Sequence, residues 1–142
     1  MGSLADLVLA TPDDIPDIVS SDYPLGSFKG TNVDGLDPLM LLALHSMLTQ
    51  TPIDELVSQY EPIAQASEEG PWLIRIPSDL LEILANIAPH DMEAMAGQWV
   101  QTHQLRGSGW TQDDMLVFIE PLILYAQSIP GSAKELFLWT YG

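Results

Sequence analysis

Apolar residues recur with helical spacing along most of the chain, and several of these segments follow a recognisable helix start. At Thr51–Asp54 a hydroxyl precedes a proline and a carboxylate, and Thr111–Asp114 repeats this order without the proline. These residue types satisfy the free backbone N–H groups of a first helical turn. We therefore predict helices over about residues 12–20, 38–49, 52–60, 78–88, 89–104 and 112–128.

Two short segments differ from this pattern. Residues 72–76 and 136–141 are rich in branched and aromatic side chains and are bounded by proline, glycine or polar residues, which is typical of strands. We expect them to pair with each other and to lie against the helices, because a two-stranded ribbon alone is only marginally stable in water. The predicted fold class is mainly α, a single-domain bundle of about five or six helices with a small two-stranded β element. An α+β fold is the alternative.

Length and pattern together indicate one domain. A chain of 142 residues buries about two thirds of its unfolded surface in a single core. Residues 1–36 should form an irregular N-terminal segment with one short helix, and residues 37–142 should form the core. The helix predicted at 112–128 is apolar on nearly every side and should be central, with a kink or break at Pro121, which removes a backbone donor.

Charge excludes several classes of function. The chain has 20 acidic residues against 4 Lys and Arg, which gives a formal net charge of −16. Binding to nucleic acid by direct phosphate contact, or to an anionic membrane, needs clustered cations, and here the cations are scattered singly. The hydrophobic fraction of 46% is too high for a disordered acidic tail. With no cysteine, and no apolar run near the roughly 18 residues of a spanning helix, we expect a soluble cytoplasmic protein.

Nearly half of the acidic residues have a structural explanation. They fall at predicted helix caps or first turns, where a carboxylate interacts favourably with the helix dipole by about 0.3–1 kcal/mol. These residues are Asp13, Asp14, Asp37, Asp54, Glu55, Asp79, Asp91, Asp113 and Asp114. The scarcity of Lys and Arg is therefore a more specific feature than the number of acids.

Candidate chemistry is sparse. No zinc-binding His-Glu pattern, nucleophile elbow or glycine-rich phosphate loop occurs, so we expect no catalytic residue, no metal and no cofactor, and we interpret His45 as a core histidine. The segment 99–110 and the irregular loop 20–35 hold aromatic, histidine and arginine side chains of the kind that anchor partners. The alternative is that the indoles seal the edge of the core. The candidate binding residues are Trp99, His103, Arg106, Trp110, Tyr23 and Phe28.

Four short motifs carry a resemblance to other proteins. They are Lys29-Gly30, the run Val33–Pro38, the pair Trp99 and Thr102, and the closing run Leu136–Trp139. Together they resemble a family of small acidic bacterial proteins to which no function is assigned. The resemblance implies a bacterial origin, a cytoplasmic location and a largely helical domain, and it transfers no catalytic residues.

Three hypotheses about function follow. The leading one is a non-enzymatic, acidic protein-binding domain, of the immunity-protein or small-inhibitor type, which meets a basic protein partner through its negative field. The alternative is a small enzyme or ligand-binding domain with a site near the 20–35 loop and the 99–110 segment. The third is a structural subunit whose apolar helices pair with a second copy to give a homodimer.

Overall fold

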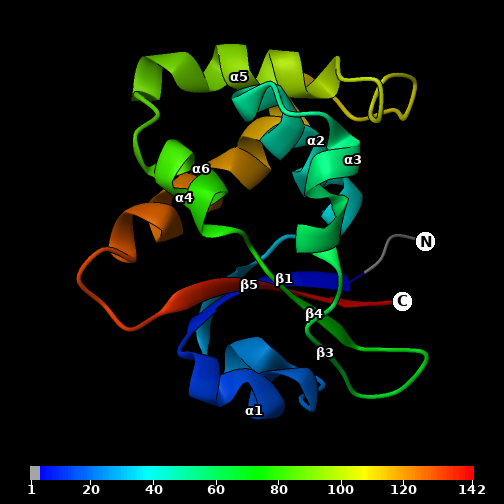
Figure 1. Cartoon of the computed structure of the whole chain (residues 1–142), viewed down its shortest axis with the longest axis vertical. Helices are drawn as coiled ribbons and strands as arrows, with labels where there is room; N and C mark the ends of the chain where they lie inside the picture. Colours follow the sequence, from blue (N-terminus) through cyan, green and yellow to red (C-terminus); the bar gives the residue numbers. More distant parts are fainter. Residues whose placement is uncertain (1–3) are drawn as a thin grey trace.

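The computed structural model describes residues 4–142, which form a five-stranded antiparallel sheet with helices on both faces (Figure 1). The order of the strands across the sheet is β2-β1-β5-β4-β3. The long strands β1 and β5 pair along their whole length, so that Leu4 lies opposite Tyr141 (Figure 1). The strands are β1 (Leu4–Ala10), β2 (Lys29–Asn32), β3 (Ala64–Gln65), β4 (Trp72–Arg75) and β5 (Glu135–Tyr141).

The prediction of a mainly α bundle is therefore wrong, and the fold is α+β. The two predicted strands are confirmed as β4 and β5, which pair with Leu73 opposite Trp139. The remaining strands had no clear sequence signal. β1 is buried along almost its whole length, so its sequence lacks the alternation of a half-exposed strand. β2 and β3 are short edge strands of mostly small and polar residues.

The N-terminal segment differs most from expectation. Residues 1–36 were predicted to be irregular apart from one helix, yet they contribute the strands β1 and β2 as well as a short helix. Residues 1–3 of this segment lie outside the described residues. Because β1 pairs with both β2 and β5, this segment is an integral part of the sheet.

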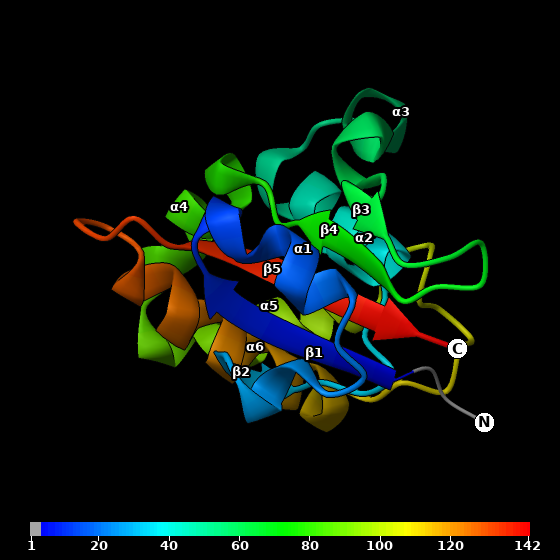
Figure 2. The same ribbon diagram turned by 90° about the horizontal axis from the view of Figure 1, so that it is seen from below.

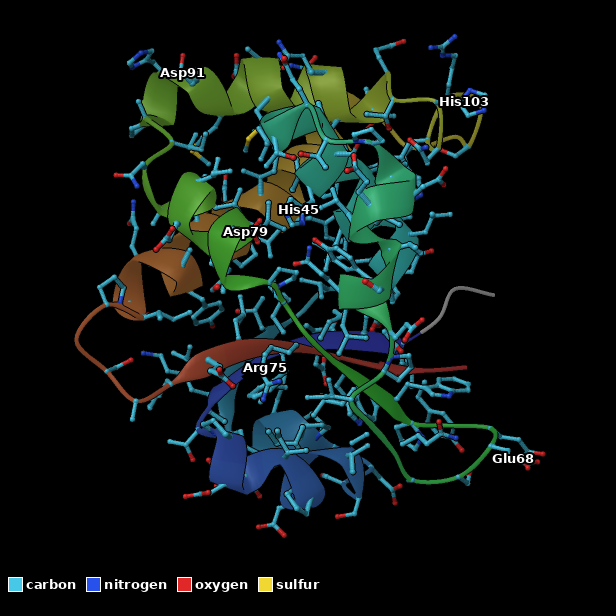
Figure 3. The ribbon with its side chains drawn as sticks, viewed as in Figure 1. His45, Glu68, Arg75, Asp79, Asp91 and His103 are labelled. Carbon is cyan, nitrogen blue, oxygen red and sulfur yellow. The ribbon has the colours of Figure 1, made fainter. Side chains whose placement is uncertain are left out.

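Helices cover the two faces of the sheet unequally. The short α1 (Ile15–Val19) lies on one face, and the other α-helices of residues 4–142 lie on the opposite face, as Figures 1 and 2 show. His103, in the loop after α5, is at the opposite end of the molecule from α1 (Figure 3). No helix within residues 4–142 combines the length and the apolar character needed to cross a membrane. The helices on the face opposite α1 are α2 (Pro38–Thr49), α3 (Ile53–Leu56), α4 (Ser78–Ala85), α5 (Met92–Val100) and α6 (Gln112–Ser128).

All six predicted helical segments contain helix, with changes at their ends. The segment 52–60 divides into α3 and a 3₁₀ turn (Val57–Tyr60), and the segment 89–104 ends at Val100. The predicted starts act as caps: Asp37 Oδ1 accepts a hydrogen bond from Met40 N at 2.8 Å, and Thr111 begins α6 with a capping box. Of the kink or break predicted at Pro121, the break is absent, since α6 runs through that residue uninterrupted.

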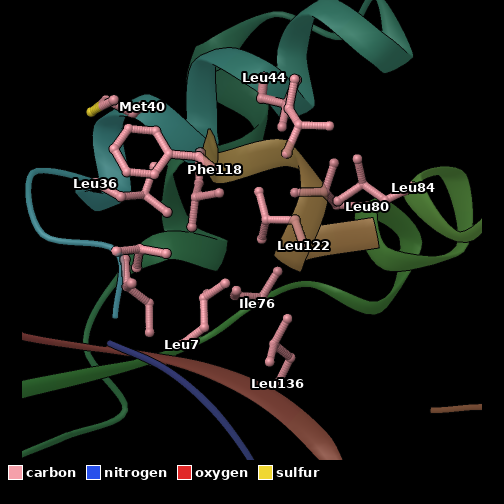
Figure 4. Close-up of a cluster of buried hydrophobic side chains, with 14 of the residues drawn as sticks. Leu7, Leu36, Met40, Leu44, Ile76, Leu80, Leu84, Phe118, Leu122 and Leu136 are labelled. Carbon is pink, nitrogen blue, oxygen red and sulfur yellow. The ribbon is translucent and has the colours of Figure 1, made fainter. Parts of the chain in front are cut away.

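Side chains alternate along the strands and divide the apolar residues between two cores. Leu7 and Leu136 point toward helices α2 to α6 and belong to the larger core, which Figure 4 shows with Leu44 and Leu122 above them. Their strand neighbours point the other way and form a smaller core beneath α1. The smaller core consists of Val8, Ala10, Ile18, Val19, Leu73, Phe137 and Trp139.

Candidate functional site

The structure places the 99–110 candidates at the end of the molecule away from α1. Trp99 is fully buried in the larger core, and its indole N–H donates to the carbonyl of Met40 at 2.9 Å. Trp110 is half-buried against Phe118, with ring centroids 5.5 Å apart. His103 and Arg106 are exposed in the loop after α5. The structure thus supports the alternative that the two indoles seal the core.

The candidates from the 20–35 loop lie on the other face of the sheet. Phe28 packs against the smaller core, and Tyr23 is 67% exposed. The two predicted segments meet at one point, between Trp110 and Gly35. The indole ring lies so close to this glycine that a Cβ on it would come within 2.7 Å of the ring. This is a packing contact, and none of the cavities described below is lined by residues of the 99–110 segment.

A cavity of about 340 Å³ opens on the α1 face of the sheet, beside the first half of β1. Tyr23 is the only sequence-predicted site residue that lines it. We call this cavity the acidic pocket, since two of its lining residues are carboxylates. Its lining is Leu4, Asp6, Asp22, Tyr23, Leu25, Asn32 and Trp139.

Strand register brings the polar lining residues together. Asp6 lies opposite Asn32 on one neighbouring strand and opposite Trp139 on the other, so the three residues form a row across β2, β1 and β5. Residues opposite each other in such pairs point to the same face and contact one another. The signal in the sequence was Asp6 itself, a single carboxylate inside the apolar run of β1.

Asp6 is a buried carboxylate held by an asparagine. It is 4% exposed, and its Oδ1 accepts from Asn32 Nδ2 at 2.9 Å. Asn32 Nδ2 also donates to Asp34 Oδ1 at 2.9 Å, so one amide group lies between two carboxylates. Burial raises the pKa of Asp6 above its ordinary value of 3.8, the Asn32 hydrogen bond offsets part of this shift, and the charge of Asp34 adds to it.

Trp139 supplies an unusual donor beside this carboxylate. Its side chain is 2% exposed, and its Nε1 is the one fully buried side-chain nitrogen or oxygen without a hydrogen-bond partner within residues 4–142. A buried donor left in this state costs about 1–3 kcal/mol, so such atoms are rare in folded proteins. An orphan donor and a buried carboxylate on adjacent strands are features of a binding site rather than of a core optimised for stability.

We expect Asp6→Asn to stabilise the protein at neutral pH by about 1 kcal/mol. The amide keeps the acceptor for Asn32 and removes the buried charge. Because folding raises the pKa of Asp6, this carboxyl keeps its proton to a higher pH in the folded protein than in the unfolded chain. The contribution of Asp6 to wild-type stability therefore falls as the pH rises above 3.8 and stops falling once the raised folded-state pKa has been passed. The gain should therefore vanish below pH 3.8, where Asp6 is protonated in both states. Urea unfolding at several pH values measures it, and destabilisation at neutral pH would contradict the prediction.

A second polar cluster lies between α2 and α4 (Figure 3). His45 is fully buried, and its Nε2 is 3.0 Å from Asp79 Oδ2 while its Nδ1 is 2.8 Å from the hydroxyl of Tyr60. Burial, and then the charge of Asp79, raise the pKa of Tyr60, so its phenol keeps its proton. In the tautomer with the ring proton on Nε2, His45 donates to Asp79 and accepts from the hydroxyl of Tyr60. The interpretation of His45 as a core histidine is confirmed.

This chain of carboxylate, imidazole and hydroxyl has the order that activates nucleophiles in enzymes. Here, however, the hydroxyl belongs to a buried tyrosine, and none of the cavities described in this section is lined by any of the three residues. Its consequence is structural: it ties α2 to the start of α4 and to the 3₁₀ turn that ends at Tyr60.

Three further cavities of about 240–360 Å³ adjoin Ser78, the first residue of α4. Leu81 and Ile129 supply apolar wall to two of the three cavities. The charged pair near them, Arg75 and Glu135, is joined by a 2.9 Å salt bridge and so is mutually neutralised. The acidic pocket, in contrast, is lined by two carboxylates and by no cation.

Comparison with known proteins gives no guide to the site, since no family model, no curated protein and no solved structure matches this chain. The acidic pocket therefore has to be interpreted from its own chemistry. Its carboxylates and apolar walls suit a positive group on an apolar stem, and its unsatisfied donor suits a hydrogen-bond acceptor.

Proposed function

We propose that this protein is a non-enzymatic, acidic protein-binding domain, of the immunity-protein or small-inhibitor type, that works in the cytoplasm and meets a basic protein through its α1 face. The acidic pocket carries the proposal. Asp6 is buried there with its pKa raised, next to a donor without a partner, and this arrangement makes the unbound protein less stable. A cationic group from a partner would neutralise the carboxylate.

The net charge of the whole chain also supports the proposal of a basic protein partner. Four cations face 20 carboxylates, and Arg75, one of those cations, is already paired with Glu135. An excess of one sign attracts a partner of the opposite sign and raises the rate of association, most strongly at low salt. A second copy of this chain at the same face would bring two negative surfaces together, so the partner we propose there is a different protein.

A small-molecule binding function is the second candidate, and the volume of the pocket favours it. About 340 Å³ falls within the roughly 300–1,000 Å³ that is usual for ligand pockets. Of the site first expected at the 20–35 loop and the 99–110 segment, only the loop contributes, through Tyr23, Leu25 and Asn32. Affinity capture of a protein partner separates the two candidate functions, because only the protein-binding function requires a macromolecular partner.

Affinity capture with a matched bait tests the proposal. The wild-type protein and the double variant Asp6→Asn, Asp22→Asn are immobilised and exposed to a bacterial lysate at about 10 mM and about 1 M salt, where charge interactions extend about 30 Å and about 3 Å. We expect the wild type to capture a defined basic protein at low salt, with weaker capture at high salt and by the variant. Recovery of no basic protein at either salt concentration would overturn the proposed function.

A further inference from the structure

We infer that the acidic pocket binds the guanidinium group of an arginine side chain presented by the basic partner. This inference rests on the proposed function and adds to it the chemical group that the site recognises. It depends on three observations, which concern an accessible carboxylate oxygen, the walls of the pocket and the orphan indole.

The first observation is that one oxygen of Asp6 is free and reachable. Oδ1 is bonded to Asn32, whereas Oδ2 makes no hydrogen bond within the described residues. Trp139 Nε1 is the only fully buried side-chain nitrogen or oxygen there without a partner, so the unpartnered Oδ2 must retain some access. Asp6 lines the acidic pocket, so we take this cavity as the route by which a ligand reaches Oδ2. Asp22, an exposed residue, adds a second carboxylate to the same lining.

The second observation concerns the walls. Leu4 and Leu25 offer apolar surface for the three methylene groups of an arginine, and Tyr23 offers an aromatic ring that is 67% exposed. A guanidinium stacks on aromatic faces and is more weakly hydrated than an ammonium, so it enters a partly buried carboxylate site more easily than lysine does. It also has several N–H donors and bonds two carboxylates at once. These properties favour arginine over lysine.

The third observation is the indole N–H of Trp139, which needs an acceptor. An arginine side chain has only donors and cannot fill this need. A main-chain carbonyl beside the arginine can do so when the indole, which lines the pocket, turns its buried Nε1 toward the ligand on binding, and a peptide carries one carbonyl at every residue. The site thus calls for an arginine within a polypeptide rather than for a simple amine, and this agrees with a protein partner.

A peptide titration tests the inference without the partner. The probes are the pentapeptide Gly-Gly-Arg-Gly-Gly and the same peptide with lysine or citrulline, the uncharged analogue of arginine, at the centre. We expect the arginine peptide to shift the Trp139 indole N–H resonance in a saturable way, the lysine peptide to bind at least about fivefold more weakly, and the citrulline peptide to leave the resonance unchanged.

Variants assign the effect to the pocket. Asp6→Asn and Asp22→Asn should each weaken binding of the arginine peptide by about tenfold or more. Asp113→Asn removes the same charge from an exposed position at the start of α6, on the far face of the sheet, and should leave the affinity within about twofold. Because Asp6→Asn is expected to be the more stable protein, unfolding does not account for a loss of binding in that variant.

Each outcome bears on a different proposal. Equal binding of the three peptides, or an affinity unchanged by Asp6→Asn, overturns the arginine inference even if a basic protein is captured. If the arginine peptide binds selectively but no basic protein is captured, the proposed function is overturned and the guanidinium site is supported.

Discussion

Replacing Trp99 by alanine is expected to lower the free energy of unfolding by about 3–5 kcal/mol. The side chain is completely buried in the larger core, and its indole N–H donates to the carbonyl of Met40, so the substitution leaves a cavity and removes this hydrogen bond. α5 would lose its side-chain hydrogen bond to α2. Urea unfolding followed by circular dichroism measures the change.

The control for this prediction is Trp110→Ala. Trp110 is half-buried, and its contacts are the ring of Phe118 and Gly35, so we expect a loss well below that of Trp99→Ala. The pair also tests whether the 99–110 segment binds a partner. If Trp99→Ala kept wild-type stability and abolished capture of the basic protein, Trp99 would be a binding residue and its placement in the core would be wrong.

Gly30→Ala is expected to destabilise the protein by about 3 kcal/mol. A Cβ on Gly30 would lie 1.9 Å from the carbonyl oxygen of Leu7, which is backbone and cannot move unless β2 separates from β1. β2 also carries Asn32, the hydrogen-bond partner of Asp6, so the acidic pocket should lose its shape together with the strand. Thermal unfolding measures the stability, and hydrogen exchange of the β1 amides shows whether the strand separates.

The matched control is the same substitution at Gly97, inside α5. There a Cβ would meet only the side chain of Gln112, at 3.5 Å, which is an ordinary contact. Alanine is favoured over glycine in a helix interior by about 1 kcal/mol, so Gly97→Ala should be neutral or stabilising. If the two variants had equal stability, the close approach of β2 to β1 would not be a real constraint.

The helices of this protein could be predicted because their signals are local. The carboxylate of Asp37 and the hydroxyl of Thr111 each accept a hydrogen bond from a backbone N–H three residues away, and these bonds fix where the helix begins. The sheet could be predicted only in part. β4 and β5 have the aromatic and branched residues that are typical of strands. The sequence of β1 is as apolar as that of a buried helix, and this segment becomes a strand because it pairs with β5, which is far away in the sequence.

The candidate site was predictable to a similar extent. Tyr23 was named as a candidate because it is an aromatic residue in a long irregular loop, and the structure places it in the lining of the acidic pocket. Asp6 and Trp139 were missed, since only the strand register brings residues so far apart in sequence to the same cavity. A single carboxylate within an apolar strand was the available sign, and it gains meaning only when its cross-strand neighbours are known.

The central position of β5 has a consequence for biosynthesis. β5 is the last of the five strands to be synthesised and lies between β1 and β4, so the growing polypeptide cannot assemble this sheet until residues 135–141 have left the ribosome. Until then β1 and β4 have unpaired edges rich in Leu, Ile and Val, which are prone to pair with other chains. A translation product that stops before β5 is therefore expected to depend on chaperones or to be degraded.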